Sequence, residues 1–192
     1  MVDPADRRRL TPAEYLELER GSEQRHEYVD GEIFAMSGGT REHSLTATNI
    51  ARELGNALAA KPCEVHSSDM RIGIPAAKRY FYADVSVVCG RPEVEDPTRD
   101  TLLNPKVIVE VLSDSTEAYD RGDKFRYYRA IASLREFVLA SQKEPRIEVF
   151  TRQPDETWLL RIFGPDDEVT LSSVGCSFDV RNAYLRVFDG SS

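Results

Sequence analysis

The chain has 192 residues, of which 41% are hydrophobic and 30% charged, a balance typical of a single soluble globular domain with a sizeable core. Its formal net charge of −8 argues against a protein that coats nucleic acid without specificity, because such proteins are normally basic. No apolar run approaches the roughly 20 residues that span a bilayer. The N-terminus has no apolar stretch of the signal-peptide kind, so we expect a cytoplasmic protein.

The N-terminal region predicts a helix, a hairpin and a second helix. Thr11 is a good N-cap and Pro12 suits the first turn of a helix whose Leu16 would face inward. Residues 25–36 carry Asp30-Gly31, a two-residue hairpin turn signal, between strand-like runs. Helical spacing then extends from Thr40 to about Ala60.

The middle of the chain alternates strands with a helix. Residues 64–74 and 80–88 each read as one strand, and residues 90–100 form a polar loop with two prolines. Residues 106–112, KVIVEVL, are almost continuously apolar, as in a strand that is covered on both faces. A helix over about residues 117–132 follows several possible N-caps.

Strands dominate the remainder, which predicts a mixed α/β fold in one domain spanning residues 1–192. We expect strands at 135–141, 146–151 and 157–163, and a short helix within 179–188. The three cysteines, Cys63, Cys89 and Cys176, are odd in number, far apart and without a CxxC pair. We therefore predict free buried thiols, with neither a disulfide nor a structural zinc site.

Three residues are the strongest candidates for chemistry. Glu110 lies within the apolar run, where a carboxylate is costly unless it is paired or binds a metal. Asp84 lies in a similar run, on a face with Tyr82 and Ser86, and two such acids would suit Mg²⁺ if their strands are neighbours. Lys124 shares a helical face with Tyr128, at the edge of the predicted core. The alternatives are a structural salt bridge for Glu110, a satisfied half-buried aspartate for Asp84 and a surface position for Lys124.

The order of these segments resembles the Uma-type family of "putative restriction endonucleases". The similar segments are EYVDGE (27–32), YADVSVV (82–88), PKVIVEVLS (105–113), YDRGDKFRYY (119–128) and EFVL (136–139), and the resemblance covers roughly residues 11–185. Through that family the chain resembles the PD-(D/E)XK nucleases. The resemblance implies a restriction-endonuclease-like central sheet flanked by helices, with an N-terminal helix and hairpin in front of it.

The resemblance also implies roles for particular residues. Asp84 and Glu110 match the acids that hold Mg²⁺, for which Mn²⁺ could substitute, in the hydrolysis of DNA phosphodiesters. The lysine expected two residues after Glu110 is replaced by Leu112, and Lys124 in the following helix matches a relocated lysine. Ala83 stands where proline is common before the aspartate. Lys124→Ala is then expected to abolish cleavage while leaving the fold and Mg²⁺ affinity nearly unchanged.

Further residues extend this site. Glu27 matches a hairpin glutamate and is expected to take a fourth place in the site, through a metal-bound water. His43 is either a structural or capping histidine or a substrate contact. Three arginines around the predicted helix could contact phosphates, although a charged helix face is usually only solvated: Arg121, Arg126 and Arg129.

Other function classes lack their sequence signatures. The chain has no GxxxxGK[ST], GxSxG, GxGxxG or HExxH motif, so we expect no nucleotide cofactor. A catalytically inactive nuclease fold used for binding or assembly is the alternative function, in which Lys124 could point away from the acids. A two-carboxylate glycosidase is disfavoured, although Trp158 and the tyrosines could form a sugar platform. We also expect a homodimer, because a two-fold pair is the commonest assembly and the hairpin and late strands offer edges.

Overall fold

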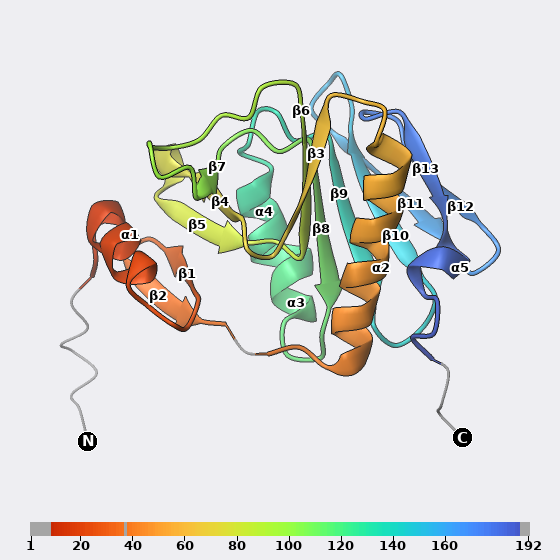
Figure 1. The fold of residues 1–192 in the computed structure, drawn as a ribbon, viewed down its shortest axis with the longest axis horizontal. Helices are drawn as coiled ribbons and strands as arrows, with labels where there is room; N and C mark the ends of the chain where they lie inside the picture. The colour runs from red at the N-terminus through yellow and green to blue at the C-terminus, as the bar shows by residue number, and fades with distance from the viewer. Residues whose placement is uncertain (1–8, 37, 189–192) are drawn as a thin grey trace.

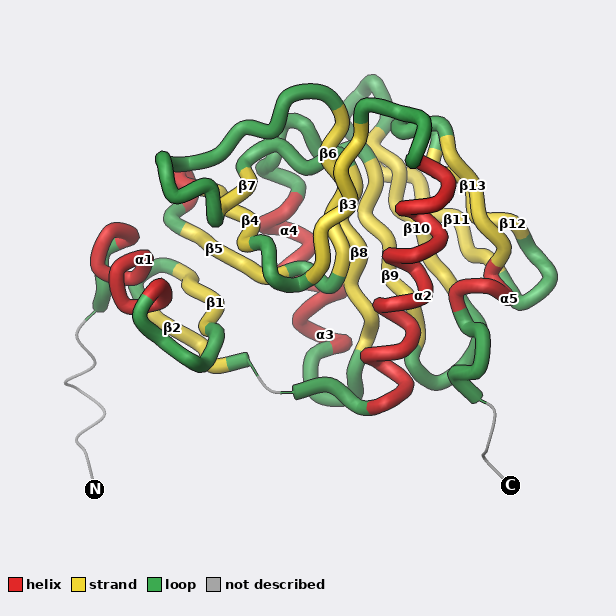
Figure 2. The backbone as a smooth tube through the Cα atoms, in the orientation of Figure 1, coloured by secondary structure: helices red, strands yellow, loops and turns green. Residues whose placement is uncertain are grey.

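The computed structural model describes residues 9–36 and 38–188 (Figures 1 and 2). The described elements alternate between strands and helices, with a 3₁₀ turn (Pro75–Ala77) and a π-helical turn (Asp120–Lys124) among them. In chain order the other elements are α1 (Pro12–Arg20), β1 (His26–Val29), β2 (Glu32–Ala35), α2 (Arg41–Leu58), β3 (Cys63–Ser67), β4 (Arg71–Ile74), β5 (Arg79–Tyr82), β6 (Val85–Cys89), β7 (Thr101–Leu102), β8 (Val107–Leu112), α3 (Glu117–Tyr119), α4 (Phe125–Tyr128), β9 (Glu136–Ser141), β10 (Ile147–Arg152), β11 (Trp158–Phe163), β12 (Glu168–Leu171), β13 (Cys176–Asp179) and α5 (Val180–Ala183).

A six-stranded sheet forms the centre of the molecule, in the order β11-β10-β9-β8-β6-β3. β8 and β9 are parallel, and the other neighbours in this sheet are antiparallel. A second sheet has the order β2-β1-β5-β4-β7, and β12 pairs with β13. The mixed α/β fold predicted from the sequence is confirmed.

β8 is covered on both faces, as its apolar sequence predicts. Val107, Val109 and Val111 pack in one core with Ile50 and Leu54 of α2, which lies across the front of the sheet in Figure 1. The alternate residues face a second core, which contains the helix after β8 and the inner strands of the five-stranded sheet. Glu110 lies on β8 between Ile108 and Leu112 of this second core, so its carboxylate points towards that helix.

The N-terminal predictions are also confirmed. Thr11 and Glu14 form a capping box at the start of α1. Asp30 and Gly31 connect β1 to β2 with positive φ angles of 51° and 101°, as a type I′ turn requires. α2 begins after its N-cap, Thr40.

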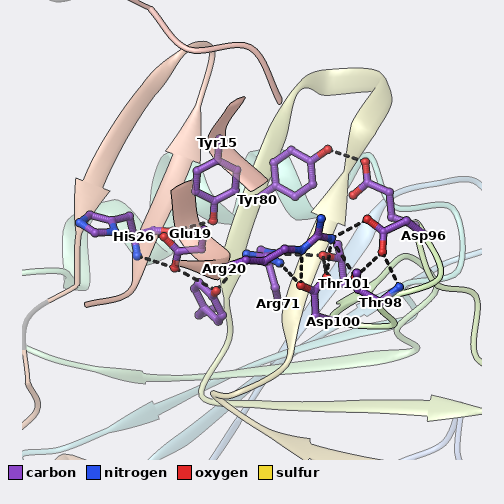
Figure 3. A network of polar contacts seen from close by, with 12 residues as sticks. Tyr15, Glu19, Arg20, His26, Arg71, Tyr80, Asp96, Thr98, Asp100 and Thr101 are labelled. Atoms are coloured by element: carbon purple, nitrogen blue, oxygen red, sulfur yellow. Dashed lines mark hydrogen bonds and ion pairs between the residues drawn. The ribbon is translucent and has the colours of Figure 1, made fainter. Parts of the chain in front are cut away.

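A buried polar network attaches α1 and the hairpin to the rest of the five-stranded sheet (Figure 3). Glu19 accepts hydrogen bonds from the backbone N–H of His26 (2.9 Å) and the hydroxyl of Tyr82 (3.0 Å). Arg71 donates to Tyr82 (3.2 Å) and pairs with Asp100 (2.9 Å). Because both Glu19 and Arg71 are buried, these bonds hold the hairpin in one position. Further residues of this network are labelled in Figure 3: Tyr15, Arg20, Tyr80, Asp96, Thr98 and Thr101.

Two predicted strands are each divided in two. Residues 64–74 form β3 and β4, and residues 80–88 form β5 and β6, with a break at Ala83 and Asp84. The reason is that β3 pairs with β6 in one sheet whereas β4 pairs with β5 in the other, so the chain changes sheets at each break. Asp84 therefore lies directly before β6 and not in the middle of a strand.

The helix predicted over residues 117–132 is shorter and less regular. Its helical part ends at Tyr128 and contains the π-helical turn. It ends early because the chain must return to the start of β8, where the backbone N–H of Arg135 donates to the carbonyl of Lys106 (2.9 Å). Ile131 and Leu134 fill the second core along the way.

The cysteine prediction is wrong for two of the three residues. Cys63 and Cys89 lie directly opposite each other on β3 and β6, with Cα atoms 4.0 Å apart, and form a disulfide. Strand pairing brings them together although 26 positions separate them in sequence. Cys176 is a free buried thiol, as predicted. The β12–β13 hairpin was not predicted, whereas α5 was.

None of the helices in the described part of the chain is long and apolar enough to cross a membrane.

Candidate active site

Lys124 lies at the centre of a buried cluster of charges. It ends the π-helical turn, and a wide turn of this kind is frequently found at functional sites. Its Nζ atom is 2.9 Å from Oε1 of Glu27, 2.9 Å from Oε1 of Glu110 and 3.7 Å from Oδ1 of Asp120. The residue is only 5% exposed, so this ammonium is a buried cation that points towards the acids.

Glu110 is held by two neighbours on the following helix. Its Oε1 atom accepts a hydrogen bond from the hydroxyl of Tyr128 (2.8 Å) in addition to its contact with Lys124. Tyr128 is fully buried, so its ring fixes the position of that hydroxyl. The shared helical face of Lys124 and Tyr128 therefore meets the Glu110 strand.

Asp84 stands beside Glu110 on the neighbouring strand. β6 and β8 are antiparallel with Val85 opposite Val109, so the residue before Val85 lies opposite Glu110. Oδ2 of Asp84 accepts a hydrogen bond from the backbone N–H of Val111 (2.7 Å). The same oxygen is 3.3 Å from Nε2 of His43 on α2.

Excess negative charge and burial shift the pKa values of the cluster. Burial raises the pKa of Glu110 well above its usual value, and the charges of Asp120 and Asp84 raise it further against the effect of Lys124. Burial by itself would lower the pKa of Lys124, but the charges around it, led by Glu110, hold that pKa well above its usual value. The surrounding acids therefore favour the protonated form of Lys124.

Asp120 is a member of the cluster that sequence reasoning missed. It is 3% exposed, and burial raises the pKa of its carboxyl. Its position four residues before Lys124, in a segment that resembles the family, was an available signal. Sequence reasoning also treated Tyr128 only as a core residue, although its hydroxyl binds Glu110.

His43 contacts Asp84, and its backbone N–H also donates to the N-cap Thr40 (3.2 Å). The hydrogen bond with Asp84 raises the pKa of the His43 imidazole. Through these two contacts His43 connects the N-terminus of α2 to the acid site.

The cluster opens into a cleft of about 1410 Å³. The hairpin, the start of α2, the end of β8 and α3 contribute to its walls. Among the described residues that line the cleft, Lys124 is the one lysine and Arg25 is the one arginine. Carboxylates are more numerous, and seven line the cleft: Glu23, Glu27, Asp84, Glu110, Asp114, Asp120 and Asp123.

The three arginines proposed as phosphate contacts do not line this cleft. Arg121 is paired with Glu148 (2.6 Å) and Glu117 (2.9 Å). Arg126 is paired with Asp123, and the guanidinium of Arg129 lies over the ring of Phe125. These contacts favour the alternative, a charged helix face that does not contribute to the cleft.

The acid site offers two carboxylates, and carboxylate oxygens are the kind of ligand that Mg²⁺ takes. Within residues 9–36 and 38–188, no group of three or more His, Cys, Asp or Glu side chains could hold a metal ion. Magnesium, however, commonly takes only one or two protein carboxylates and keeps several waters. Within the same residues, no hydrogen bond or ion pair engages Oδ1 of Asp84 or Oε2 of Glu110. The two free oxygens and the excess negative charge fit a hard divalent cation.

Residues 12–181 match the Uma2 family, whose description is "Putative restriction endonuclease". The chain belongs to this family. Two uncharacterized proteins of Synechocystis sp. are similar to this Uma2 chain. One, slr1290, is 38% identical over 92% of both chains, and the other, sll1609, is 35% identical over 85% of this chain and 93% of the relative.

The Uma2 fold is also found in a solved structure. A protein from Anabaena variabilis, described as "a putative nuclease belonging to DUF820", is similar with a TM-score of 0.74 over 91% of this chain and 97% of that chain. The two sequences are 16% identical, so the likeness concerns the fold. Membership of the Uma2 family, as predicted from the sequence motifs, is confirmed.

Proposed function

We propose that this Uma2 chain is a Mg²⁺-dependent endonuclease that hydrolyses DNA phosphodiester bonds at the cleft. The observation that carries the proposal is the buried ammonium of Lys124, 2.9 Å from both Glu27 and Glu110, next to Asp84. Burying a cation together with several acids is costly, and perturbed groups in a cleft are a common mark of catalytic sites. The position of Lys124 supports it as the substitute for the lysine that Leu112 replaces.

Each residue of the cluster would have its own role in the hydrolysis. Asp84 and Glu110 would hold Mg²⁺ (or Mn²⁺), and a metal bound there would supply polarisation of the phosphate and a lowered pKa of bound water. Lys124 would neutralise charge that develops on the phosphate, because its raised pKa makes it a cation and not a proton acceptor. Glu27 and Tyr128 would orient Lys124 and Glu110 through the contacts described above.

The alternatives have less support. An inactive binding module gives no reason for Lys124 to point into the acid cluster. Trp158, one residue considered for the sugar platform of a glycosidase, packs edge-on against Phe125 (5.2 Å) and does not line the cleft. The free carboxylate oxygens of Asp84 and Glu110, beside a fixed cation, favour phosphoryl chemistry over both.

The proposal is tested by incubating the purified protein with single-stranded, linear duplex and supercoiled plasmid DNA. We expect cleavage with Mg²⁺ or Mn²⁺, none with EDTA, and none with an Asp84→Asn variant. Asp114→Asn is the matched control, because it removes an exposed carboxylate from the same cleft and should still cut. Absence of cleavage of every DNA form with either metal, or full activity of Asp84→Asn, would refute the proposed function.

A further inference from the structure

The hairpin carries an exposed aromatic residue beside the acid cluster. Phe34 on β2 is paired with Glu27 on β1, so the two side chains share one face of the hairpin. Glu27 contacts Lys124, and Phe34 lines the same cleft. Phe34 is 49% exposed, and among the described residues the other large exposed apolar side chains are aliphatic. An aromatic ring left in water at this position is available for a ligand.

Phe34 differs from other aromatic residues of the cleft in having an uncovered ring. The ring of Tyr82 has the guanidinium groups of Arg25 and Arg71 over it, and that of Tyr127 has Arg79 at 4.1 Å. Within the described residues, no ring or cation lies against Phe34 or against Tyr119 of α3. Of these two, Phe34 is exposed, whereas Tyr119 lines the cleft but is partly buried.

The charges of the cleft are poorly suited to a DNA duplex. Duplex binding depends on many cationic contacts to phosphates on both strands. Here seven carboxylates face Lys124 and Arg25, and Arg25 is already bonded to Asp69 and to the carbonyl of Ser68. Stacking on aromatic rings needs no cation and is insensitive to base sequence. The walls therefore suit bases better than they suit a second phosphate backbone.

We propose that Phe34 stacks on an unpaired base, so that the strand cut at this site enters the cleft as single-stranded DNA. This rests on the proposed function, which places a phosphodiester beside Lys124, and it names the substrate class of that site. Phe34 is a positioning residue in this scheme, because it holds the base and not the reacting phosphate.

The test measures binding separately from cleavage. A fluorescein-labelled oligonucleotide, single-stranded or annealed to its complement, is titrated with wild-type protein in Ca²⁺, and a gel confirms that the DNA stays intact. Fluorescence anisotropy should show tighter binding of the single strand. Phe34→Leu, which keeps an apolar side chain but removes the ring, should weaken that binding about 10-fold, and Phe34→Tyr should restore it.

Ile33→Ala is the matched control. Ile33 is the neighbouring residue on β2, is similarly exposed (37%) and does not line the cleft, so its loss should leave DNA affinity unchanged. Equal or tighter binding of the duplex, wild-type affinity of Phe34→Leu, or no binding of the single strand would each overturn the stacking proposal. Because the titration needs no hydrolysis, these results are independent of whether the protein cuts DNA. A protein that cuts but prefers duplex refutes only this inference.

Discussion

The Nζ atom of Lys124 lies 2.9 Å from Oε1 of Glu27, and this ion pair joins the N-terminal hairpin to the helix that follows β8. Both side chains are largely buried, at 6% and 12% exposure, so water screens the contact weakly. One wall of the cleft is therefore attached to the residue proposed to act on the phosphate.

From the ion pair between Lys124 and Glu27 we predict that Glu27→Gln loosens the hairpin. A neutral amide attracts Lys124 less than a carboxylate, whereas Glu110 still holds the ammonium in place. We expect faster hydrogen–deuterium exchange in β1 and β2 and weaker DNA cleavage, in a protein that remains folded. Glu32→Gln, at an exposed position of the hairpin that does not line the cleft, is the control and should change neither. Unchanged exchange in Glu27→Gln would show that the ion pair does not hold the hairpin.

Lys124→Ala should abolish cleavage and also destabilise the protein. Sequence reasoning predicted little effect on the fold, but the structure places this cation among three carboxylates that its removal would leave unpaired. Removing one partner of a buried ion pair costs about 3–5 kcal/mol, less whatever protonation of the acids relieves. Urea denaturation measures the loss of stability, and a cleavage assay on folded protein measures the loss of activity.

Two further variants test whether the effect of Lys124→Ala is specific to an ammonium group at this position. Lys124→Arg should rescue cleavage poorly, because a planar guanidinium cannot take the place of a compact ammonium in a buried site. Arg126→Ala removes an exposed cation from the same helix and should keep activity, with stability within about 0.5 kcal/mol of wild type. Cleavage by Lys124→Ala at the wild-type rate would remove the relocated-lysine hypothesis.

Mg²⁺ binding should depend on Asp84 and Glu110. Isothermal titration calorimetry is expected to show about 10-fold or greater loss of Mg²⁺ affinity in Asp84→Asn and in Glu110→Gln, since fewer charged oxygen ligands remain. Asp114→Asn changes the net charge equally but should bind Mg²⁺ normally. Wild-type affinity in both Asp84→Asn and Glu110→Gln would place the metal elsewhere.

Asp120 should make stability depend on pH. Burial raises the pKa of its carboxyl in the folded protein above the ordinary 3.8, so the folded state keeps this proton to higher pH than the unfolded chain. The stability that results is complete below the unfolded pKa and is lost as pH rises through the folded pKa. Asp120→Asn cannot lose a proton, so its advantage over wild type should grow as pH rises from about 4 towards neutral.

Urea denaturation at a series of pH values measures this difference in the free energy of unfolding. The control is Asp123→Asn, whose carboxylate is 60% exposed in the same turn and whose stability should stay within about 0.5 kcal/mol of wild type. An advantage of Asp120→Asn that shrinks as pH rises would contradict the assigned direction of the shift.

We predict a homodimer, for which β11 is the best edge. This strand ends the six-stranded sheet and exposes Leu159, Leu160 and Ile162 (46%, 41% and 60%). Analytical ultracentrifugation should find a dimer that Ile162→Lys converts to monomer. Leu18→Lys, on an exposed position of α1, should stay dimeric. A wild-type monomer at high concentration would count against the assembly.

The sequence by itself determined most of the local elements and identified three acids of the cluster, Glu27, Asp84 and Glu110. Thr11, Asp30-Gly31 and the apolar run around Glu110 each carry their signal within a few residues, because caps, turns and strand alternation are short-range effects. The family motifs likewise placed Asp84, Glu110, Lys124 and Glu27 in one predicted site.

Only the tertiary structure decided which of these residues touch. The partner of Glu27, the burial of Asp120, the break at Asp84 and the disulfide between Cys63 and Cys89 all depend on which strands pair and where the chain changes sheets. Arg121 was a possible phosphate contact, but it is paired with Glu148 and does not line the cleft. Local periodicity does not specify such long-range contacts, because they arise only when segments far apart in sequence pack together.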